Sequence, residues 1–275
     1  MRKLLIALAV FSLCIVLATC RKNTKTDTQI KIAVQTWSFS KFSFSEAVEK
    51  AAALGFKYIE MYPDQKISPD NDATTHFTAS MRNRQEIKDI LKLNSVQLVN
   101  YGVVEGYSKE EWIMLFDFAK EMGIETLVSE PEFRDYPLID SLTKAYNIKL
   151  AVHNHAIGTR NWNPQTVIDN MKGLNQLVGV CPDNGHWMRS GIDPVVALKT
   201  YEGRILAMHI KDMNDFENLE AHTVPLGTGM LNASALIKEL KKQEFSGVIT
   251  IENEYNWEAP ESDIQTSLIK LLELL

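Results

Sequence analysis

Two histidines flank an asparagine in the stretch "AVHNHA", residues 151 to 156, directly behind the apolar run "IKLAV". An imidazole ring brings a donor and an acceptor that both need partners, so a buried strand tolerates it only where something binds it. The chain has only six histidines, and four of them follow apolar runs, as do several acidic residues. The candidates for chemistry are Glu130, His153, His155, Asp183, His186, His209 and Glu252.

Four of these candidates form a mixed set of oxygen and nitrogen donors: Glu130, Asp183, His209 and Glu252. Such a set holds Mn²⁺, Co²⁺, Mg²⁺ or Zn²⁺ with positions open for a substrate. A divalent metal also explains how several carboxylates crowd one cavity, because like charges alone would force one of them to bind a proton. We therefore predict a divalent metal cofactor on these residues. A single acidic residue at a strand end is as often a helix cap or a salt-bridge partner.

His153 and His155 are two positions apart, with Asn154 between them. We interpret the two histidines as alternating across the strand, so that only one of His153 and His155 faces the barrel interior and the other points toward the helical layer. We favour His155 for the catalytic site and give His153 a supporting role in contact with the substrate.

The elements that must position these residues alternate along the chain. From Ile30 onward, short β-like runs are followed by longer helical patterns eight times. The runs are "IKIAVQ", "YIEMY", "VQLVNY", "ETLVS", "IKLAVH", "LVGVCP", "ILAMHI" and "GVITIE". Most are continuously apolar, which is typical of strands buried on both faces. The helices are expected at 45–54, 84–93, 109–122, 138–146, 164–173, 194–201, 233–242 and 264–275.

Eight βα units between residues 30 and 275 predict a single (β/α)₈ TIM barrel, in which the carboxyl ends of all strands meet at one mouth. An open, doubly wound sheet is the rival arrangement. It would need a glycine-rich turn after the first strand, whereas "VQTWSFSKFSF" contains no glycine. Residues 64–80 form the longest expected irregular loop, and we interpret it as a lid or a substrate contact.

Several motifs at the strand ends resemble a known group of barrels. They are "GFKYIEMY", "HNHA", "DNGH", "HIKD" and "IENE". Together they resemble the sugar phosphate isomerase/epimerase superfamily with the xylose-isomerase-like barrel, which includes inosose dehydratases, tagatose 3-epimerases and the family 2 apurinic endonucleases. The similarity extends from Ile30 to Leu275.

The resemblance implies that Asp183, His209 and Glu252 are metal ligands. Many members carry a glutamate at the end of the fifth strand, where this chain has His153. That departure leaves Glu130, His153 and His155 as candidates for the fourth ligand, and it weakens any transfer of the two-glutamate proton shuttle of the epimerases. The resemblance also makes His186 a substrate contact and places Lys211 and Asp212 in the loop after the seventh strand.

The chemistry expected of such a site is deprotonation next to a carbonyl that a metal polarises. The enediolate can then give an isomer, an epimer or an elimination product. The residues predicted to carry catalysis are Glu252, as ligand and base, His155 and His186, as acid or base, and Lys211, beside the developing oxyanion. The residues predicted to contact substrate are Trp37, Glu60, His153, Asp212 and Trp187. Ordinary packing at the rim is an equally good interpretation of the tryptophans.

Residues 1–19 have the features of a lipoprotein signal peptide: a charged start, a short apolar core and the end "LAT", which Cys20 follows to complete "LATC". We predict cleavage before Cys20, lipidation of that cysteine, a polar tether at 20–29 and an exported domain at 30–275, anchored at the cell envelope. An uncleaved anchor or a plain secretory signal are the alternatives. Cys14 is lost with the signal peptide and Cys20 is lipidated, so Cys181 is the one remaining thiol.

The formal net charge is −6, and it becomes −8 without Arg2 and Lys3. An acidic surface repels phosphate backbones, so we expect no nucleic-acid partner and place a nuclease function last. Export also argues against phosphorylated substrates. The favoured function is a metal-dependent isomerase or epimerase of an unphosphorylated sugar or keto-sugar. The alternatives are a lyase acting on a keto-sugar or 3-keto-glycoside, and a non-catalytic sugar-binding lipoprotein. An oligomer is compatible with the sequence.

Overall fold

Eight parallel strands form one sheet within residues 30–275, the part of the chain that the computed structural model describes. The predicted signal peptide at 1–19, the tether at 20–29 and Cys20 lie outside the described residues. The strands of this sheet are β1 (Lys31–Gln35), β2 (Tyr58–Met61), β5 (Gln97–Tyr101), β6 (Thr126–Ser129), β7 (Lys149–His153), β8 (Val178–Cys181), β9 (Ala207–Ile210) and β12 (Val248–Ile251).

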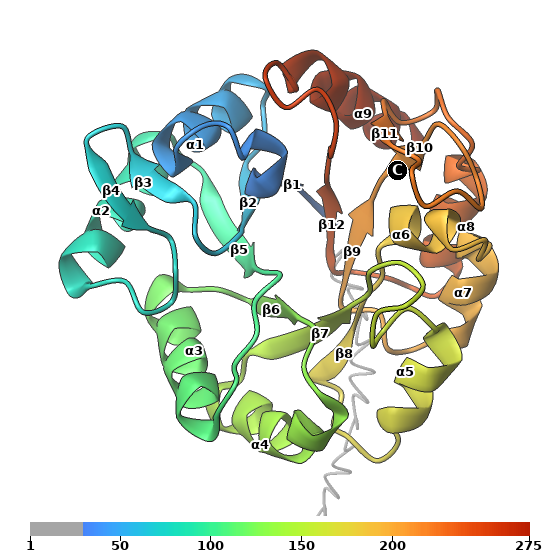
Figure 1. The fold of residues 1–275 in the computed structure, drawn as a ribbon, viewed down its shortest axis with the longest axis horizontal. Helices are drawn as coiled ribbons and strands as arrows, with labels where there is room; N and C mark the ends of the chain where they lie inside the picture. Colours follow the sequence, from blue (N-terminus) through green and yellow to red (C-terminus); the bar gives the residue numbers. More distant parts are fainter. Residues whose placement is uncertain (1–29) are drawn as a thin grey trace, which may run out of the picture.

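The sheet curls into a barrel whose order is β8-β7-β6-β5-β2-β1-β12-β9. Its two edge strands, β8 and β9, meet through isolated parallel bridges that pair Val180 with Ile205 and Asp183 with His209. Gly179 makes this closure feasible, because a Cβ there would lie 2.2 Å from the carbonyl oxygen of Arg204. The predicted (β/α)₈ barrel is confirmed (Figure 1).

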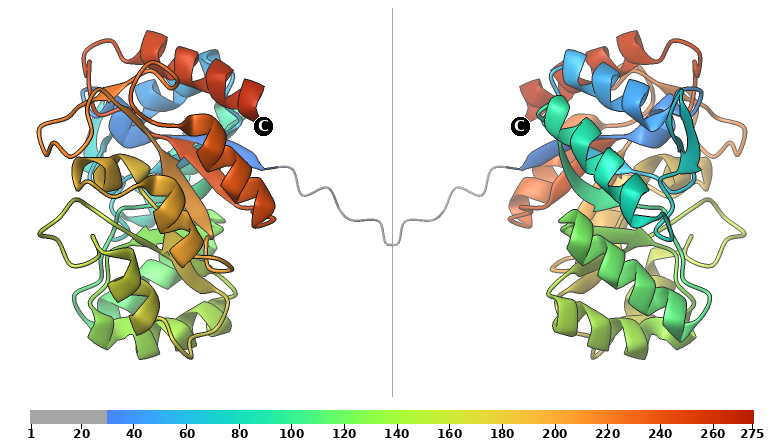
Figure 2. Two further views of the ribbon diagram at one scale, coloured as in Figure 1. Left: turned by 90° about the vertical axis from the view of Figure 1, so that its right-hand side faces the viewer. Right: turned by 90° about the vertical axis from the view of Figure 1, so that its left-hand side faces the viewer.

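Helices form the outer layer around the strands (Figure 2). They are α1 (Phe44–Ala53), α2 (Met81–Leu93), α3 (Lys109–Met122), α4 (Tyr136–Tyr146), α5 (Pro164–Asn170), α6 (Asn184–Arg189), α7 (Pro194–Thr200), α8 (Ala233–Lys242) and α9 (Glu261–Leu274). The last helix lies beside the first, where Lys50 forms an ion pair with Glu261. The large apolar core fills the space between the strands and the helices.

The alternation of the strands decides which side chains enter the barrel. In β9, Met208 and Ile210 pack in the core between sheet and helices, whereas Ala207 belongs to a small cluster inside the barrel. His209 therefore points inward, above Ala207. The same rule turns His153 of β7 and Glu252 after β12 toward the interior. The barrel interior is thus apolar at its base and polar near its mouth.

Residues 64–80 are less irregular than the sequence predicts. They contain an antiparallel hairpin of β3 (Lys66–Ser68) and β4 (Asn71–Thr74). This hairpin carries alternating polar residues with no apolar run, so its pattern does not distinguish it from a loop. A second short hairpin pairs β10 (Asp212–Met213) with β11 (Thr223–Val224), and two 3₁₀ turns, η1 (Thr36–Phe39) and η2 (Phe133–Asp135), follow β1 and β6.

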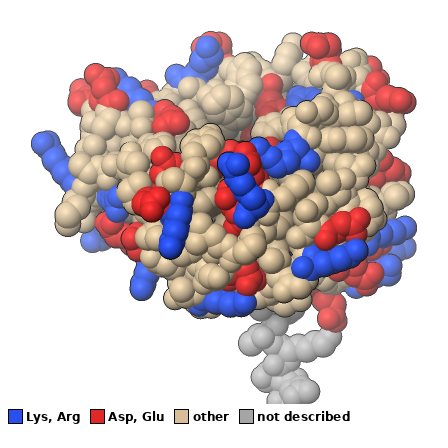
Figure 3. Space-filling view, turned by 60° about the horizontal axis from the view of Figure 1, so that its bottom comes forward, with Lys and Arg blue, Asp and Glu red and all other residues tan. Residues whose placement is uncertain are grey.

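Acidic and basic side chains are interspersed on the molecular face drawn in Figure 3, and neither kind forms a continuous patch there. Among residues 30–275, we find no helix that combines the length and the hydrophobicity needed to cross a bilayer.

Candidate metal centre and active site

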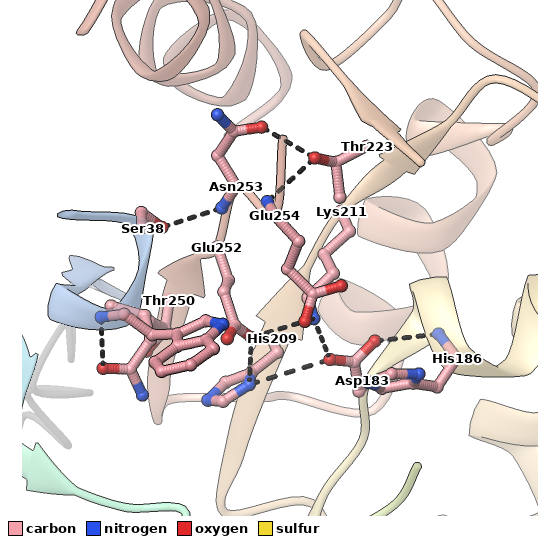
Figure 4. A network of polar contacts seen from close by, with 12 residues as sticks. Ser38, Asp183, His186, His209, Lys211, Thr223, Thr250, Glu252, Asn253 and Glu254 are labelled. Atoms are coloured by element: carbon pink, nitrogen blue, oxygen red, sulfur yellow. Dashed lines mark hydrogen bonds and ion pairs between the residues drawn. The ribbon is translucent and has the colours of Figure 1, made fainter. Parts of the chain in front are cut away.

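Four buried side chains from neighbouring strand ends converge inside the mouth of the barrel. His153 Nε2 lies 3.4 Å from Asp183 Oδ2. His209 Nδ1 lies 3.8 Å from the same oxygen and 2.9 Å from Glu252 Oε2. Figure 4 shows Asp183, His209 and Glu252 pointing toward one another. The strands β7, β8, β9 and β12 therefore bring together residues that are up to 99 positions apart in the sequence, and no single motif contains them.

Asp183 Oδ2 and Glu252 Oε2 also lie 2.9 Å and 3.0 Å from Lys211 Nζ, so the ammonium is their cationic neighbour. Two buried carboxylates and two imidazole rings crowd one small volume here, and a bound cation would offset the negative charge that remains. Two imidazole nitrogens and two carboxylate oxygens are the donors that Zn²⁺, Mn²⁺ and Co²⁺ accept. The residues present therefore fit a divalent cation. His153, Asp183 and His209 also place one ligand atom each within 4.8 Å of one another.

A carboxylate lies behind each of the two histidines. Glu130 Oε1 is 2.8 Å from Nδ1 of His153, and Glu60 Oε1 is 2.7 Å from Nε2 of His209. A neutral ring that donates its N–H to the carboxylate behind it has a free lone pair on its other nitrogen, which is the usual arrangement behind metal-binding histidines. Burial would lower the pKa of both histidines, but the acidic groups around them raise it, so a bound metal would displace a proton from each ring.

The prediction that Glu60 contacts the substrate is wrong. It is fully buried inside the barrel and does not line the cavity. Its carboxylate accepts hydrogen bonds from Gln35, Asn100 and Thr250 in addition to the contact with His209. A sugar cannot reach it, so the structure gives Glu60 a positioning role and no substrate contact.

His153 and His155 both reach the site, although the sequence argument allowed only one of them. That prediction was wrong, because residues two positions apart share one face of an extended segment, and β7 ends at His153 with His155 just beyond it. The side chain of Asn154 holds the segment after β7 in place. It donates a hydrogen bond to the carbonyl of Asp183 and accepts one from the Asp183 N–H. His155 then turns back, and its Nδ1 lies 2.5 Å from Glu130 Oε1.

Glu130 was predicted as a metal ligand, and the structure places its Oε1 between two imidazole rings. Burial would raise the pKa of Glu130, but hydrogen bonds from His153 and His155 lower it to about 2. The carboxylate is therefore ionised at neutral pH. Glu130, His153 and His155 form a second group whose ligand atoms lie within 4.8 Å of one another. The structure brings all three candidates for the fourth ligand together.

Lys211 occupies the acidic side of the site. Its Nζ lies 2.9 Å from Asp183, 3.0 Å from Glu252 and 2.8 Å from Glu254. Burial would lower the pKa of Lys211, yet these carboxylates raise it above its ordinary value. The ammonium in turn keeps the pKa of Asp183 and Glu252 low against the effect of burial. One cation thus offsets part of the charge of three buried or half-buried carboxylates.

Glu254 is a site residue that the sequence analysis missed, although it ends the motif "IENE". It lines the cavity and forms ion pairs with Lys211 and Arg189. Arg189 also lies 3.2 Å from Nδ1 of His186. The signal that could have identified Glu254 is its spacing of two from Glu252, which puts both side chains on the same side of an extended segment.

His155 and His186 lie on the same wall of the cavity, with ring centroids 4.6 Å apart. Asp183 caps α6 by accepting the His186 N–H at 3.0 Å, which fixes this histidine beside the four converging residues. Burial lowers the pKa of His186 well below its ordinary value, and the Asp183 charge only partly opposes this. His186 is therefore neutral near pH 7. The two histidines also differ in exposure: His186 is buried, whereas the side chain of His155 is 45% exposed.

A cavity of about 570 Å³ opens above these groups. Its lining includes the predicted residues Trp37, Glu130, His153, His155, His186, Lys211 and Glu252, together with Gln35, Tyr62, Asp64, Glu105, Tyr107 and Glu254. This volume is in the range of sites for small organic ligands, roughly 300–1,000 Å³.

Two predicted substrate contacts lie elsewhere. Trp187 is fully buried and packs against Tyr201, with ring centroids 5.7 Å apart, because its helical position faces the outer core. Asp212 is buried, and its carboxylate accepts backbone N–H groups of Gly227, Gly229 and Leu231. Neither residue lines the cavity. Asp212 anchors the loop before α8, which a motif match does not reveal.

The histidines and carboxylates gather at the carboxyl ends of the strands. This is the face at which (β/α)₈ barrels carry their functional sites. The chain is a member of the xylose isomerase-like TIM barrel family, whose model matches residues 48–274. This match confirms the family that the strand-end motifs predicted.

Individual proteins agree with this assignment. An inosose dehydratase from Clostridium tetani is 27% identical, and the alignment covers 77% of this chain and 82% of that protein. A crystal structure of an uncharacterized protein from Parabacteroides distasonis is 31% identical with a TM-score of 0.73, covering 90% of this chain and 99% of that one. A D-psicose 3-epimerase solved in the presence of D-fructose shares the fold at 15% identity, with a TM-score of 0.70 and coverage of 90% and 99%.

Proposed function

We propose that this protein is a metal-dependent enzyme that removes a proton next to the carbonyl of an unphosphorylated sugar or keto-sugar, and thereby isomerises or epimerises it. The observation that carries the proposal is the convergence of His153, Asp183, His209 and Glu252 inside the mouth of the barrel, beside a cavity of about 570 Å³ that His153 and Glu252 line. Its family membership agrees with this chemistry.

His153, Asp183, His209 and Glu252 would hold the metal, and Glu130 and Glu60 would orient the two histidines. When bound, a divalent cation supplies Lewis-acid polarisation of a carbonyl and lowers the pKa of the neighbouring C–H. This assignment gives the fourth ligand position to His153 in place of Glu130, because the Glu130 oxygen is already taken by two imidazole N–H groups. The donor set is compatible with Mn²⁺, Co²⁺, Mg²⁺ and Zn²⁺.

His155 would transfer the proton. Its Nδ1 faces Glu130, so its Nε2 is the nitrogen left for the substrate, and the ionised Glu130 carboxylate stabilises the imidazolium that forms. Neutral His186 would contact a substrate hydroxyl on the same wall. Lys211 would keep a positive charge beside the oxygens that gain negative charge while holding Glu252 and Glu254 in place.

The charges around the cavity support an unphosphorylated substrate. Among the described residues that line the cavity, Lys211 is the only lysine or arginine, and three carboxylates surround its ammonium. Asp64 and Glu105 add further negative charge to the lining. A phosphate group would find repulsion here and no free cation, so a neutral sugar suits the cavity better.

A lyase that eliminates a β-substituent from a keto-sugar is the second candidate. The similarity to an inosose dehydratase favours it. The contact between His155 and His186 also favours it, because a base and an acid on one wall can act on neighbouring carbons of one sugar ring.

Proton exchange in D₂O distinguishes these functions. The metal-loaded protein is incubated with a panel of aldoses, ketoses and keto-sugars, and products are followed by NMR. An isomerase or epimerase incorporates solvent deuterium at carbon and yields a sugar of the same mass apart from that label. A lyase yields an unsaturated product. Binding of sugars with neither exchange nor elimination would contradict both candidates and favour a sugar-binding lipoprotein.

We also infer export and lipid anchoring at Cys20, which rest on the features of residues 1–20 alone. Expression of the full chain with radiolabelled palmitate tests this. The parent chain should carry the label and sediment with the envelope, whereas Cys20→Ala should lose the label. An unlabelled parent chain would contradict the anchor and leave the proposed chemistry untouched.

A further inference from the structure

The side chain of Arg189 is held in place behind His186. The two residues are three positions apart in α6, a spacing that brings side chains to the same face of a helix. Nε of Arg189 donates to the carbonyl of Ala221 at 2.9 Å, and its Nη1 lies 3.0 Å from a carboxylate oxygen of Glu254. Glu254 is itself paired with Lys211 at 2.8 Å (Figure 4). The guanidinium is therefore anchored independently of the histidine.

The contact between Arg189 and His186 determines which imidazole nitrogen carries the hydrogen. Nη1 of Arg189 lies 3.2 Å from Nδ1 of His186. A guanidinium has only donors and stays protonated, so Nδ1 must accept this hydrogen bond with its lone pair. A neutral imidazole with an accepting Nδ1 carries its hydrogen on Nε2. An imidazolium is disfavoured here, because its Nδ1–H would face another donor of the same charge.

The free nitrogen of His186 is available to a bound molecule. The backbone of this residue is held at both polar groups, since Asp183 accepts its N–H at 3.0 Å and the Ser190 hydroxyl donates to its carbonyl at 2.7 Å. His186 lines the cavity, and within residues 30–275 its Nε2 has no hydrogen-bond partner. The ring therefore presents an N–H donor that no group of the described chain uses.

His155, on the same wall of the cavity, has the opposite arrangement. Its Nδ1 faces an oxygen of Glu130, and an ionised carboxylate only accepts hydrogen bonds. Nε2 of a neutral His155 then carries the lone pair, whereas Nε2 of His186 carries the hydrogen. The two ring centroids lie 4.6 Å apart. One wall of the cavity thus offers a proton acceptor beside a hydrogen-bond donor.

We propose that Arg189 is a positioning residue that holds His186 in the Nε2–H tautomer, so that His186 donates a hydrogen bond to a substrate oxygen while His155 accepts the proton from carbon. The tautomer stands by itself, and the reaction step rests on the proposed function. In that step the proton moves from carbon to Nε2 of His155. The electron pair of the C–H bond forms the enediolate double bond, and negative charge collects on oxygen, where a donor stabilises it.

NMR of the ring nitrogens tests this assignment without turnover. The full chain is labelled with ¹⁵N-histidine and measured with Mg²⁺, which is diamagnetic, and the His186 signals are identified by their loss in His186→Gln. Arg189→Met removes the donors and keeps an unbranched side chain. Arg204→Met is the matched control, because Arg204 donates to three backbone carbonyls but precedes β9, at the end of the barrel opposite to the mouth. Thermal melting shows that each variant is folded.

In the parent chain, Nδ1 of His186 should have the chemical shift of a bare nitrogen and Nε2 that of a protonated one. Arg189→Met should populate both tautomers, whereas Arg204→Met should match the parent. A hydrogen on Nδ1 of His186 in the parent, or an unchanged tautomer in folded Arg189→Met, would overturn the role of Arg189.

The reaction step is tested with the sugar that exchanges most rapidly in the D₂O panel. Arg189→Met should lower kcat about tenfold and leave KM within about twofold, because the donor acts on charge that develops during the reaction. An unchanged kcat together with a shifted tautomer would overturn the donor role of His186. If the parent has the Nε2–H tautomer but exchanges none of the sugars, the positioning role of Arg189 is supported and only the proposed function is overturned.

Discussion

The Glu60 carboxylate lies 2.7 Å from Nε2 of His209, although the two residues are 149 positions apart in the chain. β2 and β9 bring them together in the barrel interior, where neither is exposed. This contact orients the histidine whose other nitrogen faces Asp183 and Glu252. A residue that touches no substrate therefore controls the geometry of the proposed metal centre.

Glu60→Gln should lower metal affinity by about 10- to 100-fold, because an amide no longer fixes the His209 tautomer as a carboxylate does. Metal content after dialysis and a dye-competition Kd measure the effect. Glu86→Gln is the matched control, since Glu86 also accepts side-chain hydrogen bonds, from Ser68 and Asn71, but far from the site. Unchanged metal affinity in Glu60→Gln would remove Glu60 from the centre.

Removal of the metal should abolish turnover, and Mn²⁺ or Co²⁺ should restore it. A bound cation should also stabilise the fold by about 2.7 kcal/mol at a free concentration about 100 times Kd. For a domain of this size, that corresponds to an increase in Tm of about 5–10 °C. Full activity of chelated protein would contradict the mechanism.

The variants His153→Gln and His155→Gln separate a ligand from a proton-transfer residue. His153→Gln should lose bound metal and activity together. His155→Gln should retain metal, because of these two histidines it is His153 that directs a nitrogen at Asp183, and should lower kcat by about 10²- to 10⁴-fold. Metal analysis and kinetics on the same samples provide the comparison. Loss of metal from His155→Gln alone would exchange the two assignments.

Asp212→Asn should reduce stability without changing sugar recognition. The Asp212 oxygens accept N–H groups from Gly227, Gly229 and Leu231, and the weaker acceptor should cost about 1–3 kcal/mol. We expect a decrease in Tm of about 2–12 °C, with KM of the folded fraction within about twofold of the parent. A large increase in KM at unchanged Tm would restore Asp212 as a substrate contact.

Local pattern was sufficient for the eight strands and for most helices. Apolar runs followed by helical patterns recur in each βα unit, so the barrel follows from counting them. The start of α2 lies at Met81, three residues before the predicted position, because Ser80 caps the helix and the intervening residues lack an apolar period. Helix ends depend on such single contacts, which periodicity does not record.

The directions of side chains that follow a strand end could be determined only from the structure. Alternation correctly turns His209 and Glu252 inward, but the chain leaves β7 at His153, and the Asn154 contacts with Asp183 then set the path of His155. Trp187 illustrates the same limit: it stands next to His186 in sequence, yet the helix rotates it into the core. One residue of helix turns a side chain through about 100°.

The amino-acid sequence by itself determined the barrel, the kinds of residue at its mouth and the family to which the chain belongs, because these depend on local periodicity and on residue type. Only the tertiary structure decided that Glu60 and Glu130 stand behind histidines, that Asp212 anchors a loop and that Lys211 joins three carboxylates. These roles depend on distances between side chains of different strands. Such distances arise only when the sheet closes and sets the register of each strand against its neighbours.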